Sequence, residues 1–249
     1  MIGIFAAIGG GLFVLASLVV GGRLMWMARQ TRGLPELALG SALFLMGGVG
    51  YPLMSAAILA TSLSNDTRTG MLVTQMISTL VGMGGIVWFT RKVFRPGAAW
   101  ATVLWLAVTG AYIGLAGAQW LGPGLLAFLA EPEKGPWAMG MYAGIVAMTW
   151  AGVESIRYWR MQQKRLALGL ADPVVADRFR LWGTAILTAD AISIISGGFQ
   201  WAGVKMAGTA SGALVVGFLG LYAASMLWLA FVPSAGYLER VRRRAAVTA

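Results

Sequence analysis

Cysteine and histidine are both absent from the 249 residues, and charged side chains make up only 11% of them. Without cysteine the chain forms no disulfide and holds no iron–sulfur cluster. Without histidine it lacks the usual general base at neutral pH and the commonest metal ligand. Soluble domains carry about 25% charged residues, so a soluble enzyme is excluded, and we expect no metal and no cofactor.

Apolar residues fill the space that charge leaves: 58% of the side chains are hydrophobic, and the mean hydropathy is +0.75. A helix needs about 20 mostly apolar residues to cross a bilayer. The sequence therefore predicts an all-α polytopic membrane protein, a single seven-transmembrane-helix bundle over residues 1–249. The predicted spans are 3–24, 36–60, 69–90, 99–120, 137–158, 181–203 and 209–231.

Basic residues divide unevenly between the two sides of this bundle. The first, third and fifth connections and the C-terminal tail hold 16 of the 19, whereas the other side holds Arg68, Lys134 and Lys205. The positive-inside rule then places the N-terminus outside and the C-terminus in the cytoplasm. The net charge of +10 is thus explained mostly by the orientation of the chain in the membrane and not by a nucleic-acid-binding patch. The same charge also favours contact with anionic lipids.

The fifth connection predicts a helical hairpin over 159–180 that projects into the cytoplasm. Gly169 is a plausible stop for the incoming helix, and Asp172-Pro173 is typical of an N-cap followed by proline at the first helical position. About ten residues of each helix would project, or about 15 Å at 1.5 Å per residue. The hairpin is either a docking surface for a cytoplasmic protein or, more simply, a solvated connection. Its basic surface comprises Arg157, Arg160, Lys164, Arg165, Arg178 and Arg180.

The fourth connection contains an apolar stretch, Leu125 to Leu129, that is too short to span a bilayer. It predicts either a segment lying on the outer leaflet, the simpler interpretation, or a lid over the bundle. On the inner side, Glu154 lies one turn before Arg157, so we expect an ion pair between them.

Asp190 is the one acidic residue predicted near the middle of the bilayer, ten residues beyond Arg180. An aspartate there costs roughly 2.5–3.5 kcal/mol on insertion scales. We therefore expect an inward-facing, protonated and hydrogen-bonded carboxyl. It serves as a proton relay, cation site or ligand anchor, or it ties the sixth helix to a neighbour as a structural hydrogen bond.

Polar and aromatic side chains occur at matching depth in other predicted helices. With Asp190 they predict a pocket that binds a ligand or a proton. Taken singly, each is also explained as an interhelical contact worth about 0.6 kcal/mol. The further candidates are Ser193, Gln75, Thr79, Thr109, Tyr112, Tyr142, Thr149 and Tyr222.

Two backbone features add to this pattern. Pro52 lies inside the second span and predicts a hinge. Pairs of glycines four residues apart predict close helix packing, either within the bundle or between protomers, and they are Gly110/Gly114, Gly140/Gly144 and Gly208/Gly212.

The layout of seven helices with an external N-terminus resembles that of microbial rhodopsins and G-protein-coupled receptors. Covalent retinal would need a lysine within the seventh helix, whereas Lys205 precedes it. SWEET-type sugar transporters share the helix count, but they resemble two repeats with prolines in helices one and five, and neither helix has an internal proline here.

Three classes of function remain. The first is a sensory or regulatory protein that binds a small or lipidic ligand within the bundle and signals through the hairpin. The second is a small-solute or proton-coupled transporter that uses Asp190, and the third is an accessory subunit of a membrane complex. An intramembrane enzyme is least expected, since the acids are separated and no serine has an identifiable base. The inward charge bias points to the bacterial inner membrane.

Overall fold

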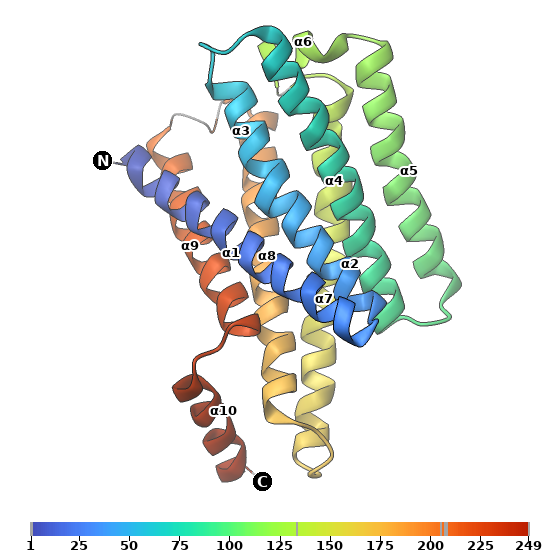
Figure 1. Cartoon of the computed structure of the whole chain (residues 1–249), viewed down its shortest axis with the longest axis vertical. Helices are drawn as coiled ribbons and strands as arrows, with labels where there is room; N and C mark the ends of the chain where they lie inside the picture. The colour runs from blue at the N-terminus through green and yellow to red at the C-terminus, as the bar shows by residue number, and fades with distance from the viewer. Residues whose placement is uncertain (1, 133, 205, 207–208, 249) are drawn as a thin grey trace.

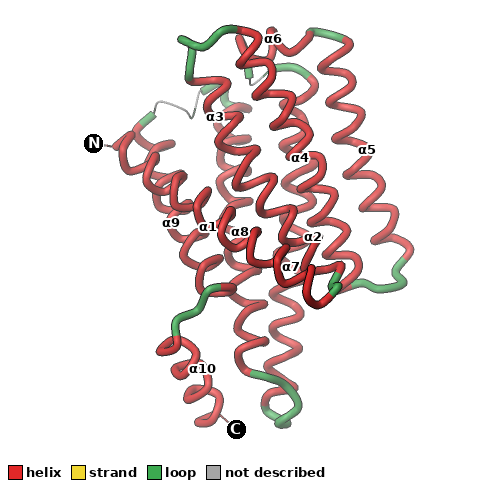
Figure 2. The backbone as a smooth tube through the Cα atoms, in the orientation of Figure 1, coloured by secondary structure: helices red, strands yellow, loops and turns green. Residues whose placement is uncertain are grey.

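The computed structural model describes residues 2–132, 134–204, 206 and 209–248, so Lys205 and Gly208 lie outside the described residues. All regular structure in the described part of the chain is helical (Figure 2). The long elements are α1 (Ile2–Thr31), α4 (Asn65–Phe94), α5 (Ala99–Leu121), α7 (Gly140–Leu166), α8 (Pro173–Trp201) and α9 (Ala210–Phe231). The second span is divided into α2 (Leu34–Ala42), the π-helix η1 (Leu43–Gly50) and α3 (Tyr51–Leu59). Shorter elements are α6 (Gly124–Ala130), the 3₁₀ helix η2 (Pro136–Met139) and α10 (Ala235–Thr248).

The long helices form a closed ring of contacts. Along this ring α1 packs on α9, α9 on α8, α8 on α7, α7 on α4, and α4 on the α2–α3 rod, which returns to α1. α5 lies outside the ring against α4 and α7 (Figure 1). α4 supplies much of the buried core, including Leu72, Ile86 and Val87. A helix that packs on both sides in this way is placed to transmit movement between its neighbours.

Within the described residues, six helices are long and apolar enough to cross a membrane: α1, the α2–α3 rod, α4, α5, α8 and α9. α7 is not among them, because charged residues fill its second half from Glu154 to Arg165. The predicted seventh crossing therefore rests on the position of α7 beside α8, and the orientation of the bundle stays a prediction.

One end of the bundle, here called the basic end, holds the α1–α2, α4–α5 and α7–α8 connections and α10 (Figure 1). Gly169, with φ +70°, follows α7. The Asp172 carboxylate caps α8 by accepting hydrogen bonds from the Val174 and Val175 amides at 2.7 and 3.3 Å. Both sequence predictions for this turn are confirmed.

The π-helix η1 ends directly before Pro52. Proline has no amide hydrogen, and its ring clashes with the carbonyl four residues earlier. The Tyr51 amide accordingly donates to the Met46 carbonyl, five residues back. The predicted irregularity is thus a widened stretch of helix, a form often found at functional sites.

Of the glycine pairs that the spacing pattern selected, Gly140/Gly144 makes close contacts, since a Cβ on these residues would lie 3.1 and 2.8 Å from the Tyr112 side chain of α5. Other close contacts depend on glycines that the pattern did not select. A Cβ on Gly21 of α1 would lie 2.8 Å from the Gly40 carbonyl oxygen of α2, and one on Gly9 would lie 2.5 Å from the Gly217 oxygen of α9. In contrast, Gly110 and Gly114 of α5 face open space. This pair therefore makes no close contact within the described bundle, because α5 turns this side away from it, and packing of the pair between protomers stays a prediction.

The apolar stretch in the fourth connection is a lid rather than a segment lying on the leaflet. α6 buries Leu125, Phe128 and Leu129 against the core. The buried Gln119 side chain holds the lid, since its amide donates to the Gly124 carbonyl at 2.7 Å and its oxygen accepts from the Trp137 amide at 3.2 Å. The simpler interpretation of this segment was therefore wrong, because three of its apolar side chains fill the end of the bundle.

Candidate functional site

Asp190 is 2% exposed and lies between α8 and α7. The Thr149 hydroxyl of α7 donates to Asp190 Oδ2 at 2.5 Å. Asp190 Oδ1 is buried and has no hydrogen-bond partner within the described residues. The predicted inward-facing carboxyl is therefore present, with half of its hydrogen-bonding capacity unused.

The other predicted site residues do not all gather around this carboxyl. Tyr142 and Tyr222 are 39% and 47% exposed, so both lie on the outside of the bundle. Ser193 is half-buried on α8. The structure thus joins Asp190 to Thr149 by a hydrogen bond and leaves both tyrosines facing the surroundings.

Three further candidates lie on α4 and α5. Gln75 of α4 is buried, and its amide donates to the Thr79 hydroxyl one turn further on at 2.9 Å. Tyr112 of α5 is buried, with its ring 5.7 Å from that of Trp137 in an edge-to-face arrangement. A Cβ on Gly144 would lie 2.8 Å from the Tyr112 hydroxyl. The Tyr112 side chain of α5 therefore packs directly against α7.

Thr109, also on α5, belongs to a different feature, a groove of about 380 Å³ between α4 and α5. Its lining is almost wholly apolar and consists of Leu80, Val81, Gly84, Gly85, Trp88, Trp105, Thr109 and Ile113. The Trp105 indole N–H donates to the Gly84 carbonyl at 3.2 Å. The Thr109 hydroxyl is buried without a partner among the described residues. The groove therefore has an apolar wall, with one unpartnered hydroxyl buried just behind its surface.

The basic end of α4 is tied to the α7–α8 hairpin. Glu154 of α7 is buried and receives both Arg95 Nη2 at 2.8 Å and Arg95 Nε at 2.9 Å. The predicted partner Arg157 is present but more distant, at 3.8 Å. The interpretation of Glu154 as a pair within one helix was incomplete, because residues 59 positions apart meet here.

An aromatic cluster lies beside this ion pair. The Phe94 ring of α4 is 5.5 Å from the Tyr158 ring of α7 and 5.8 Å from the Phe179 ring of α8. Tyr158 and Phe179 are themselves 4.5 Å apart. Edge-to-face and tilted arrangements of this kind add about 0.5–1.5 kcal/mol per pair beyond the burial of area. α4, α7 and α8 are therefore fastened together where the hairpin begins.

Most of the predicted basic surface is exposed on the hairpin. Arg157, Arg160, Lys164, Arg165 and Arg178 are all exposed. Arg180 differs: it is half-buried, and its Nη2 and Nε donate to Asp177 Oδ1 at 2.7 and 2.9 Å. Arg180 is therefore an internal ion-pair partner rather than part of the open surface.

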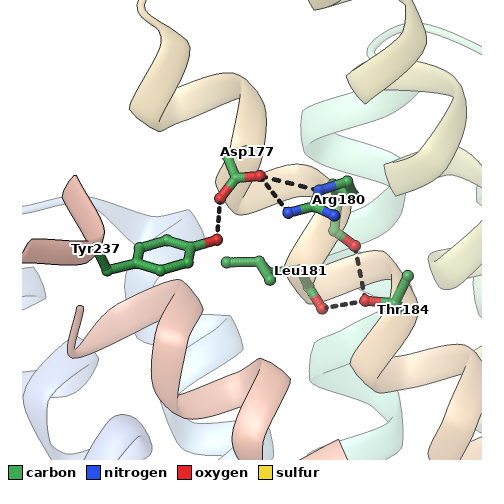
Figure 3. Close-up of polar contacts among 5 residues, drawn as sticks. All are labelled: Asp177, Arg180, Leu181, Thr184 and Tyr237. Carbon is green, nitrogen blue, oxygen red and sulfur yellow. Dashed lines mark hydrogen bonds and ion pairs between the residues drawn. The ribbon is translucent and has the colours of Figure 1, made fainter. Parts of the chain in front are cut away.

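Asp177 also holds α10, which the sequence interpretation treated only as a tail. The Tyr237 hydroxyl of α10 donates to Asp177 Oδ2 at 2.5 Å, so this carboxylate joins Tyr237 to Arg180 (Figure 3). Burial, followed by the hydrogen bond to Asp177 and its negative charge, raises the pKa of Tyr237 above its ordinary value. Tyr237, Leu238 and Val241 lie on the apolar side of α10, a helical spacing that could have predicted this element.

The comparisons with known proteins give no identity. No protein-family model, characterised protein or solved structure matches the chain.

Proposed function

We propose that this chain is a regulatory membrane protein that senses a hydrocarbon-soluble ligand in the groove between α4 and α5. The observation that carries the proposal is the groove itself, with the unpartnered Thr109 hydroxyl in its wall. Its volume of about 380 Å³ lies within the range of small-molecule sites, about 300–1,000 Å³. Because α4 and α5 are both apolar enough to cross a membrane, such a ligand enters sideways from the bilayer.

The lining restricts the chemistry of the ligand. An almost wholly apolar wall favours a hydrocarbon body, and Thr109 accepts or donates a single hydrogen bond. Thr109 lies ten residues into α5, or about 15 Å along the helix axis. Phospholipids carry their oxygens at the interface, so the matching ligand is one with a hydroxyl or carbonyl group deep in the hydrocarbon.

The route from groove to hairpin runs along α4. Trp88 lines the groove, and six residues further on the same helix Phe94 contacts Tyr158 and Phe179. Arg95 follows with its ion pair to Glu154. A ligand that shifts or rotates α4 therefore acts directly on the start of the hairpin, provided that it binds the two helix positions with different affinity.

The proposed setting is a bacterial inner membrane with the basic end in the cytoplasm. The uneven division of basic residues supports this orientation. α7 is the seventh crossing in this arrangement, and its packing on α4, α5 and α8 supports that assignment.

The experiment fills the groove with a larger side chain and compares which molecules co-purify with the variant and with the wild type. A Cβ on Gly84 would lie 3.7 Å from Thr109 Oγ1, an ordinary van der Waals distance, so we expect the further carbons of Gly84→Leu to extend into the groove and occupy the space. We expect mass spectrometry of organic extracts to detect an apolar oxygen-bearing molecule with the purified wild type but not with Gly84→Leu. Gly110→Leu, on the open side of α5, is the matched control. Equal retention by all three proteins would exclude the groove as the site.

Asp190 supports a second candidate, a proton-coupled transporter. Its buried carboxyl has one unpartnered oxygen, and intramembrane acids often carry protons. The π-helix before Pro52 supplies an irregular helix that could reorient.

A flux assay separates the two functions. In proteoliposomes with an imposed pH gradient, a transporter would change the pH inside the vesicles, which a trapped pH-sensitive dye reports. Asp190→Asn would abolish that change. A regulatory protein gives no flux with either chain. Thr188→Val, which changes a hydroxyl bonded within its own helix, controls for general damage to α8.

A further inference from the structure

The α7–α8 hairpin and α10 together form one strongly basic unit. Residues 157–180 and 235–248 contain ten basic and three acidic residues. The three acids are all engaged: Asp172 caps α8, Asp177 binds Arg180 and Tyr237, and Glu239 lies 3.7 Å from Arg243. Little negative charge is left to balance the exposed arginines and lysine.

Helical spacing orders this charge into stripes. Arg157, Arg160 and Lys164 follow one another at three and four residues along α7. Arg243 and Arg244 lie three and four residues beyond Arg240 along α10. Side chains at this spacing lie on one side of a helix. Each helix therefore presents a row of positive charge rather than a scattered distribution.

The docking of α10 fixes where its row points. Leu238 and Val241 line a cavity of only about 10 Å³ together with Leu181 and Leu229, at the base of α8 and α9. The Tyr237–Asp177 hydrogen bond holds the same side of the helix. With its apolar side occupied, α10 turns Arg240 and Arg243 of its row outward, where both are exposed.

We propose that the hairpin and α10 form a docking surface for an acidic segment of a cytoplasmic protein. Charge complementarity argues for the acidic partner. The direction of the helices argues for a soluble one, because α10 runs beside the hairpin and away from the rest of the bundle (Figure 1). Lys164 and Arg165 lie seven and eight residues beyond Arg157, or about 12 Å further along the axis of α7. This distance exceeds the screening length of about 8 Å, so charges on lipid headgroups at the level of Arg157 attract these two residues only weakly.

This inference rests on the proposed function, since it names the partner of the hairpin. The two can nevertheless fail separately, because the binding experiment below uses no ligand in the groove. A groove that retains no molecule leaves the docking result unchanged, and a failed docking result leaves the ligand site intact.

The test uses a fluorescein-labelled deca-glutamate peptide and fluorescence anisotropy, with the full chain in zwitterionic nanodiscs. The double variant Arg240→Gln/Arg243→Gln should bind about tenfold more weakly. Arg29→Gln/Lys92→Gln removes the same charge from exposed positions of α1 and α4 at the same end, and it should bind as the wild type does. Equal weakening by both double variants would mean that net charge alone attracts the peptide and would overturn the proposal.

Two further probes distinguish other anions. Vesicles containing phosphatidylglycerol, or duplex DNA, would replace the peptide as the favoured occupant if Arg240→Gln/Arg243→Gln weakened their binding but not that of the peptide. Tyr237→Phe keeps every charge but removes the hydrogen bond that holds α10. It should weaken peptide binding about threefold, whereas unchanged affinity would show that α10 contributes no oriented surface.

Discussion

At the scale of single residues, the Asp190–Thr149 pair is the clearest case of a buried polar contact in the bundle. Its carboxyl has one partner and one unpartnered oxygen. Loss of the partner would leave both oxygens buried and unsatisfied, which costs about 1–3 kcal/mol in proteins generally. The pair therefore stabilises the packing of α7 on α8, whether or not the carboxyl also carries a proton.

Thr149→Val keeps the shape of the side chain and removes the donor to Asp190. We expect a loss of about 1–2 kcal/mol in stability, or a melting temperature lower by roughly 2–8 °C, measured by thermal unfolding in detergent. Thr188→Val is the control, because the Thr188 hydroxyl donates to the Thr184 carbonyl of its own helix. An equal loss in both variants would mean that the bond to Asp190 contributes nothing of its own.

At the scale of helices, α1 makes close backbone contacts with α2 in addition to packing buried side chains such as Val20 and Leu24. Gly21 and Gly40 approach each other so closely that a Cβ on either would lie within 2.9 Å of the other's carbonyl oxygen. Neighbouring Gly22 has nothing within 4 Å of such an atom. Two adjacent glycines in one helix thus have opposite structural roles.

Gly21→Ala should lower stability by about 1–3 kcal/mol, because α1 and α2 must separate to admit the methyl group. Gly22→Ala should leave stability unchanged or raise it by up to about 1 kcal/mol, because alanine favours a helix. Thermal unfolding of the two variants side by side measures the contrast. The close contact would be refuted if Gly21→Ala were as stable as Gly22→Ala.

α10 depends on a tyrosine that must keep its proton. Its pKa in the folded chain is raised above the ordinary 10.0, so the docking contribution is complete below pH 10 and is lost as the pH rises through the higher folded value. Asp177 then faces a second negative charge, with Arg180 paired to it and Arg178 lining the same cavity. Alkaline pH should therefore release α10.

The absence of cysteine makes this release measurable with introduced labels. Spin labels at Leu168→Cys on the hairpin and Arg243→Cys on α10 should report one narrow distance distribution at neutral pH and a broad one well above pH 10. In the Tyr237→Phe background the distribution should be the same at both pH values. A narrow distribution that persists at high pH in the wild type would contradict the role of Tyr237.

At the scale of the whole molecule, the number of crossings decides where the two ends of the chain lie. Six helices qualify by length and composition, and α7 would be the seventh. With seven crossings the ends lie on opposite sides, and with six they share one.

Single cysteines at Gly3 and Gly236 test this directly, since both positions have nothing within 4 Å of an added Cβ. In intact cells a membrane-impermeant maleimide should label Gly3→Cys but label Gly236→Cys only after permeabilisation. Labelling of both in intact cells, or of neither, would reject seven crossings and with them the proposed orientation.

The sequence by itself determined the helical rods and their ends. Long apolar runs leave a chain in hydrocarbon no alternative to satisfying its backbone within each helix, and the turn at Gly169 and Asp172 follows from local capping chemistry. The inward position of Asp190 was also predictable, because an exposed carboxyl in lipid is too costly.

Only the tertiary structure decided which side of each rod meets a neighbour. Tyr142 and Tyr222 were predicted to line the pocket of Asp190, yet both turned outward, because a helix that is apolar all round carries no signal of which face is buried. Arg95 met Glu154 across 59 residues, and α4 and α5 left a groove at Thr109. Such contacts depend on the rotation and spacing of packed helices, which local sequence does not encode.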